Sequence, residues 1–258
     1  MKKIFVFFCI ALFLTILSPV YGAQFGPAEP LPGIAKNKFA VSAGYFYQTA
    51  DMEPSGSAWD NQKIEQNNAY IQLSYAPNKL FEVYLRGGAA DFKAPDAFNL
   101  GTTTVNFGDN PKAFGTLGVK CFLYNTPSFG IAPFAQGSYY SSYKDNIEFV
   151  KAGISYATEV KFKNPWDINL GLIFQTKLQK VTLYGGPFVY WFKTKVENST
   201  SPALAGSTTA NNSTTYEEKN NVGGFLGFRI PITEKVSFDV EGQYKSRFSI
   251  GGAAHYAF

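Results

Sequence analysis

The feature that most constrains this chain is an alternation of apolar and polar residues with a period of two. In residues 236–245, for example, Phe238 and Val240 alternate with Asp239 and Glu241. Successive side chains point to opposite faces of a β-strand, so the pattern predicts a strand with one apolar and one polar face. Ten such segments are separated by clusters of Pro, Gly, Asn, Asp or Ser. The predicted strands cover residues 38–48, 69–76, 81–89, 113–123, 129–139, 166–178, 181–196, 219–230, 236–245 and 249–258.

Alternation alone fits a soluble sandwich or barrel as well as a membrane barrel, because each has one apolar face. Charge distinguishes them: no charged residue falls on the apolar face of any of the ten segments. A Lys or Arg that faces lipid costs about 2–4 kcal/mol at mid-depth, so a lipid-facing surface excludes charge more strictly than a soluble core does. After residue 22, no apolar stretch is long enough for a membrane helix. We therefore expect the apolar faces to meet lipid and the polar faces to line the interior.

Aromatic residues gather at the ends of the predicted strands, as expected for rings at the two boundaries of a bilayer. One predicted girdle contains Tyr75, Phe81, Phe129, Trp166, Phe228 and Phe258. The other contains Tyr45, Tyr47, Tyr139, Trp191 and Tyr244. The sequence thus predicts an all-β fold, a closed antiparallel transmembrane β-barrel.

Short and long connections alternate along the chain. The short ones are residues 77–79, 125–128, 179–180 and 231–235, and the long ones are residues 50–67, 92–111, 140–165 and 197–218. Short periplasmic turns and long extracellular loops are typical of outer-membrane barrels. Residues 147–163 also alternate, and they complicate the count. Either they rise above the membrane as a flap of a ten-strand barrel, which we favour, or they fold at Gly153 into a hairpin that makes twelve strands.

The amino-terminal residues predict export. Lys2 and Lys3 precede an apolar run over residues 4–17, and small residues follow at Gly22 and Ala23. This is the plan of a secretory signal peptide over residues 1–22, with cleavage after Gly22 or Ala23 and a barrel domain over residues 23–258. Only one cysteine would remain in the mature chain, so no internal disulfide is expected.

The carboxyl-terminal residues 251–258 end in Tyr256, Ala257 and Phe258. With the signal peptide and the ten alternating segments, they give a chain that resembles the small outer-membrane β-barrel family of Gram-negative bacteria, the OmpA membrane-domain and OmpW type. The segment over residues 184–188 is similar to the same group. The resemblance implies contact with outer-membrane lipid, and it implies that Tyr256 and Phe258 form the assembly signal for the barrel-insertion machinery. The chain is longer than the eight-strand members, so their roles do not transfer directly.

Charged residues on the predicted inward faces are the candidate functional residues. They are Glu82, Arg86, Lys120, Asp167, Lys177, Arg229, Asp239, Glu241 and Lys245. Five bases and four acids nearly cancel, so we expect an ionic network that braces the barrel lumen. If the lumen holds water instead, the same charges line a narrow passive conduit for small solutes.

Other functions have less support in the sequence. His255 is the only histidine and lies near the periplasmic end, far from an external substrate, so we expect no enzyme activity. No metal-ligand cluster, calcium loop or phosphate-binding loop is present, so we expect no cofactor. A formal net charge of +4 is too small to indicate nucleic acid. The alternative to a structural barrel or conduit is a surface-binding module, in which residues 141–163 and 198–218 contact a ligand, cell or phage of unknown identity.

Overall fold

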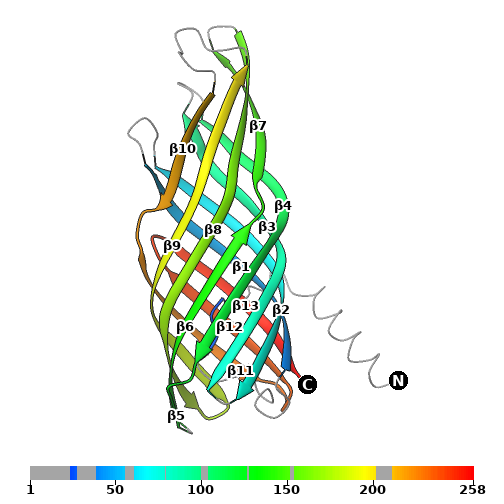
Figure 1. Ribbon diagram of the computed structural model, residues 1–258, viewed down its shortest axis with the longest axis vertical. Helices are drawn as coiled ribbons and strands as arrows, with labels where there is room; N and C mark the ends of the chain where they lie inside the picture. The colour runs from blue at the N-terminus through cyan, green and yellow to red at the C-terminus, as the bar shows by residue number, and fades with distance from the viewer. Residues whose placement is uncertain are drawn as a thin grey trace, which may run out of the picture.

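The computed structural model describes residues 24–27, 39–55, 61–78, 80–99, 104–126, 128–151, 154–201 and 211–258. One antiparallel sheet closes on itself to form a tall, tilted barrel (Figure 1). In this part of the chain, no helix is long and apolar enough to cross a membrane. The predicted signal peptide over residues 1–22 lies outside the described residues.

The sheet contains β1 (Phe39–Pro54), β2 (Gln62–Asn78), β3 (Phe81–Asn99), β4 (Thr104–Cys121), β5 (Tyr124–Asn125), β6 (Phe129–Tyr140), β7 (Tyr143–Lys151), β8 (Ile154–Leu178), β9 (Val181–Ser201), β10 (Asn211–Glu218), β11 (Val222–Pro231), β12 (Val236–Tyr244) and β13 (Phe248–Ala257). The ring runs β1-β2-β3-β4-β6-β8-β9-β11-β12-β13 and returns to β1. Ten antiparallel strands therefore close the barrel, as the alternation predicts.

Strands β7 and β10 lengthen the wall and add no strand to the ring. β6 and β7 keep one register against β8, with Tyr139 opposite Trp166 and Tyr143 opposite Phe162. Only Ser141 and Ser142 separate the two strands. In the same way, β10 and β11 follow one another along β9. Residues 143–151 and 154–163 thus continue the wall along β6 and β8 and add no strand to the ring, and the alternative of twelve strands is wrong.

The ring narrows towards its outer end. The β12–β13 hairpin stops at Tyr244 and Phe248, and beyond it β10 pairs directly with β1, with Met52 opposite Glu218 (Figure 1). On the opposite wall β7 lies against β4, where the Lys144 N–H donates to Asp109 Oδ2 at 2.7 Å. We call this eight-strand part the outer extension; its described residues are 50–55, 61–66, 91–99, 104–112, 141–151, 154–164, 192–201 and 211–219. The remaining ten-strand part is the membrane barrel.

The membrane barrel has its apolar face outside and its charges inside. Val83 and Leu172 are each 40% exposed, whereas Glu82, Asp239 and Glu241 are buried in the lumen. Within a bilayer such an outward face meets lipid, and closure leaves no unpaired strand edge there. The predicted orientation of the two faces is confirmed.

Trp166 does not lie where the sequence analysis places it. It is paired with Tyr139 on β6, and Trp191 is paired with the next outward residue of β8, Ile168. Trp166 therefore belongs to the outer girdle with Tyr139 and Trp191, not to the girdle of Phe258. The reason is that β8 already begins at Ile154, so Trp166 lies within a long strand at the level where that strand leaves the membrane.

The connections predicted as long loops are mostly strand. β1 runs to Pro54 and β2 begins at Gln62, while β9 extends to Ser201 and is paired there with β8 and β10. Their inward side chains are apolar and their outward ones are largely charged, which is the reverse of the membrane barrel. The sequence analysis searched for strands with an uncharged outward face, and so it missed these extensions.

Candidate functional site in the barrel lumen

The lumen of the membrane barrel holds residues 24–27 of the same chain. The backbone N–H groups of Gln24, Phe25 and Gly26 donate to the carboxylate of Glu241 at 3.1, 3.1 and 2.9 Å. Successive N–H groups that converge in this way form an anion-binding nest. Gly26 completes the nest with a φ of +72°, a conformation that is strained for residues with a Cβ.

Phe25 anchors the segment by its side chain. Its ring is buried against three aromatic rings of the wall, with centroid distances of 4.4 Å to Phe134, 5.0 Å to Phe188 and 5.0 Å to Phe225. Tilted and edge-to-face arrangements of this kind are favourable beyond the area that they bury. The segment is therefore held by a backbone contact and a side-chain contact on different strands.

Two buried cations also contact the segment. Arg86 Nη2 donates to the Gln24 carbonyl at 3.0 Å and to Gln72 Oε1 at 2.7 Å. The Lys120 ammonium donates to the Pro27 carbonyl at 3.2 Å. Buried charges need such hydrogen bonds to offset their lost hydration. Residues 24–27 thus complete the bonding of three of the predicted lumen charges: Arg86, Lys120 and Glu241.

The other predicted lumen residues form local contacts along the wall. Arg229 binds Asp239 through two nitrogen–oxygen contacts of 2.7 Å. Asp167 accepts hydrogen bonds from Ser138, Tyr140 and Asn169, and Lys245 lies 4.0 Å from Glu218. Glu82 is directly opposite Lys120 across β3 and β4. Lys177 differs, because it is exposed at the periplasmic end of β8 and lies outside this buried group.

His255 has two partners that the sequence analysis did not identify. Its Nδ1 lies 2.7 Å from Ser42 Oγ, and its Nε2 lies 3.0 Å from Asp239 Oδ2. The three side chains come from β1, β12 and β13, so only closure of the ring brings them together. A catalytic triad has the opposite arrangement: imidazole Nε2 faces the Ser hydroxyl, and Nδ1 donates to a carboxylate that orients the ring. Here Asp239 is already bound by Arg229, and all three side chains are buried.

The outer extension has a lumen of different chemistry. A cluster of buried apolar side chains fills it, with Phe92 at its centre. The Phe92 ring lies 4.6 Å from Phe162, 5.1 Å from Tyr143 and 6.1 Å from Phe107. The lumen is thus filled at two levels, by ions and residues 24–27 in the membrane barrel and by aromatic rings above.

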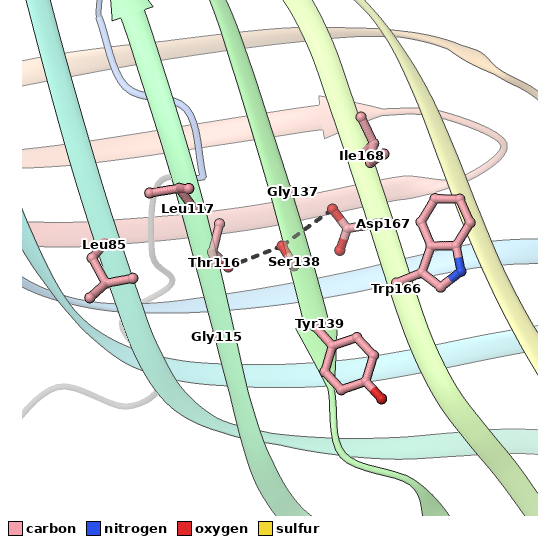
Figure 2. Close-up of a pocket in the computed structure, with 10 residues that line it drawn as sticks. All are labelled: Leu85, Gly115, Thr116, Leu117, Gly137, Ser138, Tyr139, Trp166, Asp167 and Ile168. Atoms are coloured by element: carbon pink, nitrogen blue, oxygen red, sulfur yellow. Dashed lines mark hydrogen bonds between the residues drawn. The ribbon is translucent and has the colours of Figure 1, made fainter.

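The outer wall carries two shallow grooves. One, of about 430 Å³, lies beside the outer girdle and is lined by Leu85, Leu117, Tyr139, Trp166 and Ile168 (Figure 2). It exists because Gly115 and Gly137 leave outward positions without side chains. Behind it, Ser138 is hydrogen-bonded to Thr116 and Asp167 (Figure 2). The second groove, of about 450 Å³, is polar and lies on the outer extension.

Metal binding has no support from the described residues, in which no three His, Cys, Asp or Glu side chains are grouped to hold an ion. The predicted assembly residues Tyr256 and Phe258 lie on the outward side at the end of the chain. Their rings form an edge-to-face pair with centroids 5.4 Å apart. Their role as an assembly signal stays a prediction.

Comparison with known proteins finds similarity of fold only. No family model and no curated protein matches the chain. Similar solved structures include the outer membrane protease OmpT from Escherichia coli (13% identity, 90% of this chain and 100% of that chain, TM-score 0.49). Another is the translocator domain of autotransporter NalP from Neisseria meningitidis (10% identity, 86% of this chain and 88% of that chain, TM-score 0.45). A third is the outer membrane protein AlkL in DMPC lipid bilayers (14% identity, 94% of this chain and 97% of that chain, TM-score 0.42).

These identities and TM-scores are too low to carry an argument about activity. The assignment rests instead on the ring itself. Ten antiparallel strands with apolar side chains outside, charged side chains inside and aromatic residues at both rims match the pattern of a barrel that spans a bilayer. The chain has the fold of a small transmembrane β-barrel of the outer-membrane type.

Proposed function

We propose that this protein is a closed structural barrel rather than an open conduit. The observation that carries the proposal is the filling of the lumen at two successive levels. In the membrane barrel, residues 24–27 and the charged side chains occupy the interior. In the outer extension, the aromatic cluster around Phe92 does so. A solute would have to displace both fillings to pass.

Conductance across planar lipid bilayers tests this proposal. We expect no steady open-channel current from the wild-type protein. Because the two fillings lie in series, Phe25→Ala and Phe92→Ala should each leave the barrel closed, whereas the double variant should leak. A stable open state of the wild-type protein would contradict the proposal and restore the conduit as the better hypothesis.

We also propose that the protein has no enzyme activity and that Ser42, His255 and Asp239 tie three strands together. Their burial and the Arg229–Asp239 pair support this role. On this proposal, His255→Gln lowers stability because it breaks contacts to β1 and β12. Incubation with phospholipid or peptide substrates should show no turnover in either protein. Turnover by the wild type that is lost in His255→Gln would contradict the proposal.

The outer extension supports a second candidate, a surface-binding module. It stands beyond the outer girdle, and its polar groove is lined by Glu159, Lys161, Glu197, Asn198, Ser199, Asn212 and Ser213. A ligand would meet this strand face, because most of residues 141–163 and 198–218 form wall. Side chains of this kind suit a polar ligand such as a glycan.

A glycan array, probed with purified protein in detergent, tests the second candidate. We expect specific binding that is lost when Asn198 and Asn212 are both replaced by Ala. Lys63→Ala, on a different strand of the outer extension, serves as the matched control and should retain binding. Absence of any specific glycan signal, or equal binding by all three proteins, would exclude a glycan site in this groove.

A further inference from the structure

Glu241 and Arg86 are among the buried charges of the lumen that have no partner of opposite charge within 4.0 Å in the described part of the chain. In the described part of the chain, no nitrogen of Lys, Arg or His lies within 4.0 Å of the Glu241 carboxylate, and no carboxylate oxygen lies that close to Arg86. Both side chains are nevertheless almost fully buried. A buried ion without a counter-ion is costly unless other groups bind it closely.

One residue of the amino-terminal segment serves both ions. The Gln24 N–H donates to Glu241 Oε1 at 3.1 Å, and the Gln24 carbonyl accepts from Arg86 Nη2 at 3.0 Å. Glu241 also accepts hydrogen bonds from Phe25, Gly26 and Gln243. The carboxylate therefore binds three successive backbone N–H groups, and among the described side chains no cation lies within 4.0 Å of it.

We propose that the lumen of the membrane barrel is a receptor site for a peptide amino terminus, and that the mature amino terminus of this chain is its resident ligand. Hydrolysis after Gly22 or Ala23 would consume one water, leave a carboxylate on the released signal peptide and leave an amine on the barrel. That amine is mostly protonated at neutral pH. After cleavage at Ala23 it would lie at Gln24 N, 3.1 Å from Glu241 Oε1, and supply a cation there.

The site also selects the residues that follow the amine. Phe134, Phe188 and Phe225 surround one aromatic ring. The next residue has a positive φ, and a Cβ added there would lie 3.2 Å from Lys120 Nζ. The ligand class is thus a short peptide with a free amino terminus, an aromatic residue near it and a glycine immediately after the aromatic residue. This inference does not depend on whether the lumen conducts solutes.

Chemical labelling of the folded mature protein tests the resident amino terminus. A water-soluble amine-reactive ester is applied to the protein in detergent, and modified peptides are quantified by mass spectrometry. Lys180 and Lys235, which are exposed at the periplasmic turns, serve as internal references. We expect the α-amine to react at least about tenfold more slowly than these lysines, because it is reached only after local opening.

Two variants separate the site from general loosening of the barrel. Glu241→Gln keeps the shape of the side chain and removes its charge, and we expect it to expose the α-amine to the reagent. Glu82→Gln makes the same change at a buried carboxylate that is not among the hydrogen-bond partners of residues 24–27, and should leave the amine protected. Equal labelling of the wild-type amine and Lys180 would overturn the proposal, as would a mature chain that retains residues before Ala23 or begins with pyroglutamate.

Peptide complementation tests the receptor directly. A variant that lacks residues 24–27 is refolded, and its thermal unfolding is followed with added Gln-Phe-Gly-Pro amide. A ligand that binds only the folded state raises the unfolding temperature with concentration. We expect the acetylated peptide to bind about tenfold more weakly, because it loses one charge-assisted contact, and Gln-Ala-Gly-Pro amide to give no shift. Equal shifts from all three peptides would refute recognition of the amine and the ring. If this variant does not fold, the labelling result decides alone.

Discussion

The membrane barrel and the outer extension are built from the same strands with opposite polarity. On β9, Val189 and Trp191 face outward below the rim, and Lys193 and Lys195 face outward above it. Inside, the charges around Glu241 give way to the aromatic cluster around Phe92. The difference shows that one face of a strand can be apolar along part of its length and charged along the rest. The environment of each face, lipid or water, decides which residues it tolerates.

Three neighbouring strands change polarity by a shift of phase. On β8, Phe162 points inward and Ile168 outward, although they are six positions apart and a regular strand would place them on the same face. Asn164 lies between them, with a φ of 48°. β4 changes its buried face between Phe107 and Phe114, and β6–β7 changes it between Tyr140 and Tyr143, so that β6–β7 keeps one register against β8. The register of the backbone pairing shifts where these strands meet their other neighbours, between β4 and β3 and between β8 and β9.

We expect the largest difference in the free energy of unfolding between removal of a buried charge and removal of an exposed one. Asp239→Asn leaves the Arg229 guanidinium buried without its anion, and we expect the free energy of unfolding to fall by about 3–5 kcal/mol. Glu197→Gln makes the same change in the outer extension, where the pairs with Lys163 and Lys195 are open to water. We expect a much smaller loss there, because water screens the pairs. Denaturant unfolding in lipid vesicles measures both, and equal losses would remove the contrast between the two parts.

A second pair of variants compares aromatic packing. Phe92→Ala creates a cavity among the rings of the outer extension and should cost about 3–5 kcal/mol. Phe174→Ala removes an outward ring of the membrane barrel, where lipid can fill the space. We expect a smaller loss. Hydrogen exchange should show the Phe92 variant losing protection mainly in the outer extension. Uniform loss through both parts would show that they unfold as one unit.

Adding charge to the outward face tests where lipid ends. Leu170→Lys places an ammonium within the lipid-facing surface and should cost about 2–4 kcal/mol. Asn146→Lys adds the same side chain to the outward face of β7, where we expect a change within about 0.5 kcal/mol. Unfolding in lipid vesicles compares the two. Tolerance of Lys at residue 170 would place the membrane elsewhere on the barrel.

The smallest effect concerns the ion pairs of the outer extension. Hydrogen bonds from Lys163 and Lys195 lower the pKa of Glu197 to about 2 from a usual 4.5. A lowered pKa in the folded state means that the contribution to stability is present above about pH 4.5 and is lost as the pH falls through 2. Carbon-13 NMR titration of the carboxyl group should show this midpoint, and added salt should raise it. A midpoint near 4.5 at low salt would show that the pairs do not form.

Much of the fold could be predicted because alternation is local information. Phe238 and Asp239 are neighbours in the sequence, and their opposite faces follow from strand geometry alone. Of the lumen charges, eight are buried as expected, because they share faces that exclude lipid. Ser42 and residues 24–27 could not be found in this way. Their partners His255 and Glu241 are more than two hundred residues away, and only closure of the ring brings them together.

The sequence by itself determined that the chain forms strands, that one face of each excludes charge and that the result must be placed in lipid. These properties depend on the composition and period of short segments. Only the tertiary structure decided how far the wall extends beyond the lipid, where it narrows from ten strands to eight, and which side of each extension points inward. A single inserted residue reverses the two faces of a strand without altering its local pattern, so that choice depends on pairing with distant strands.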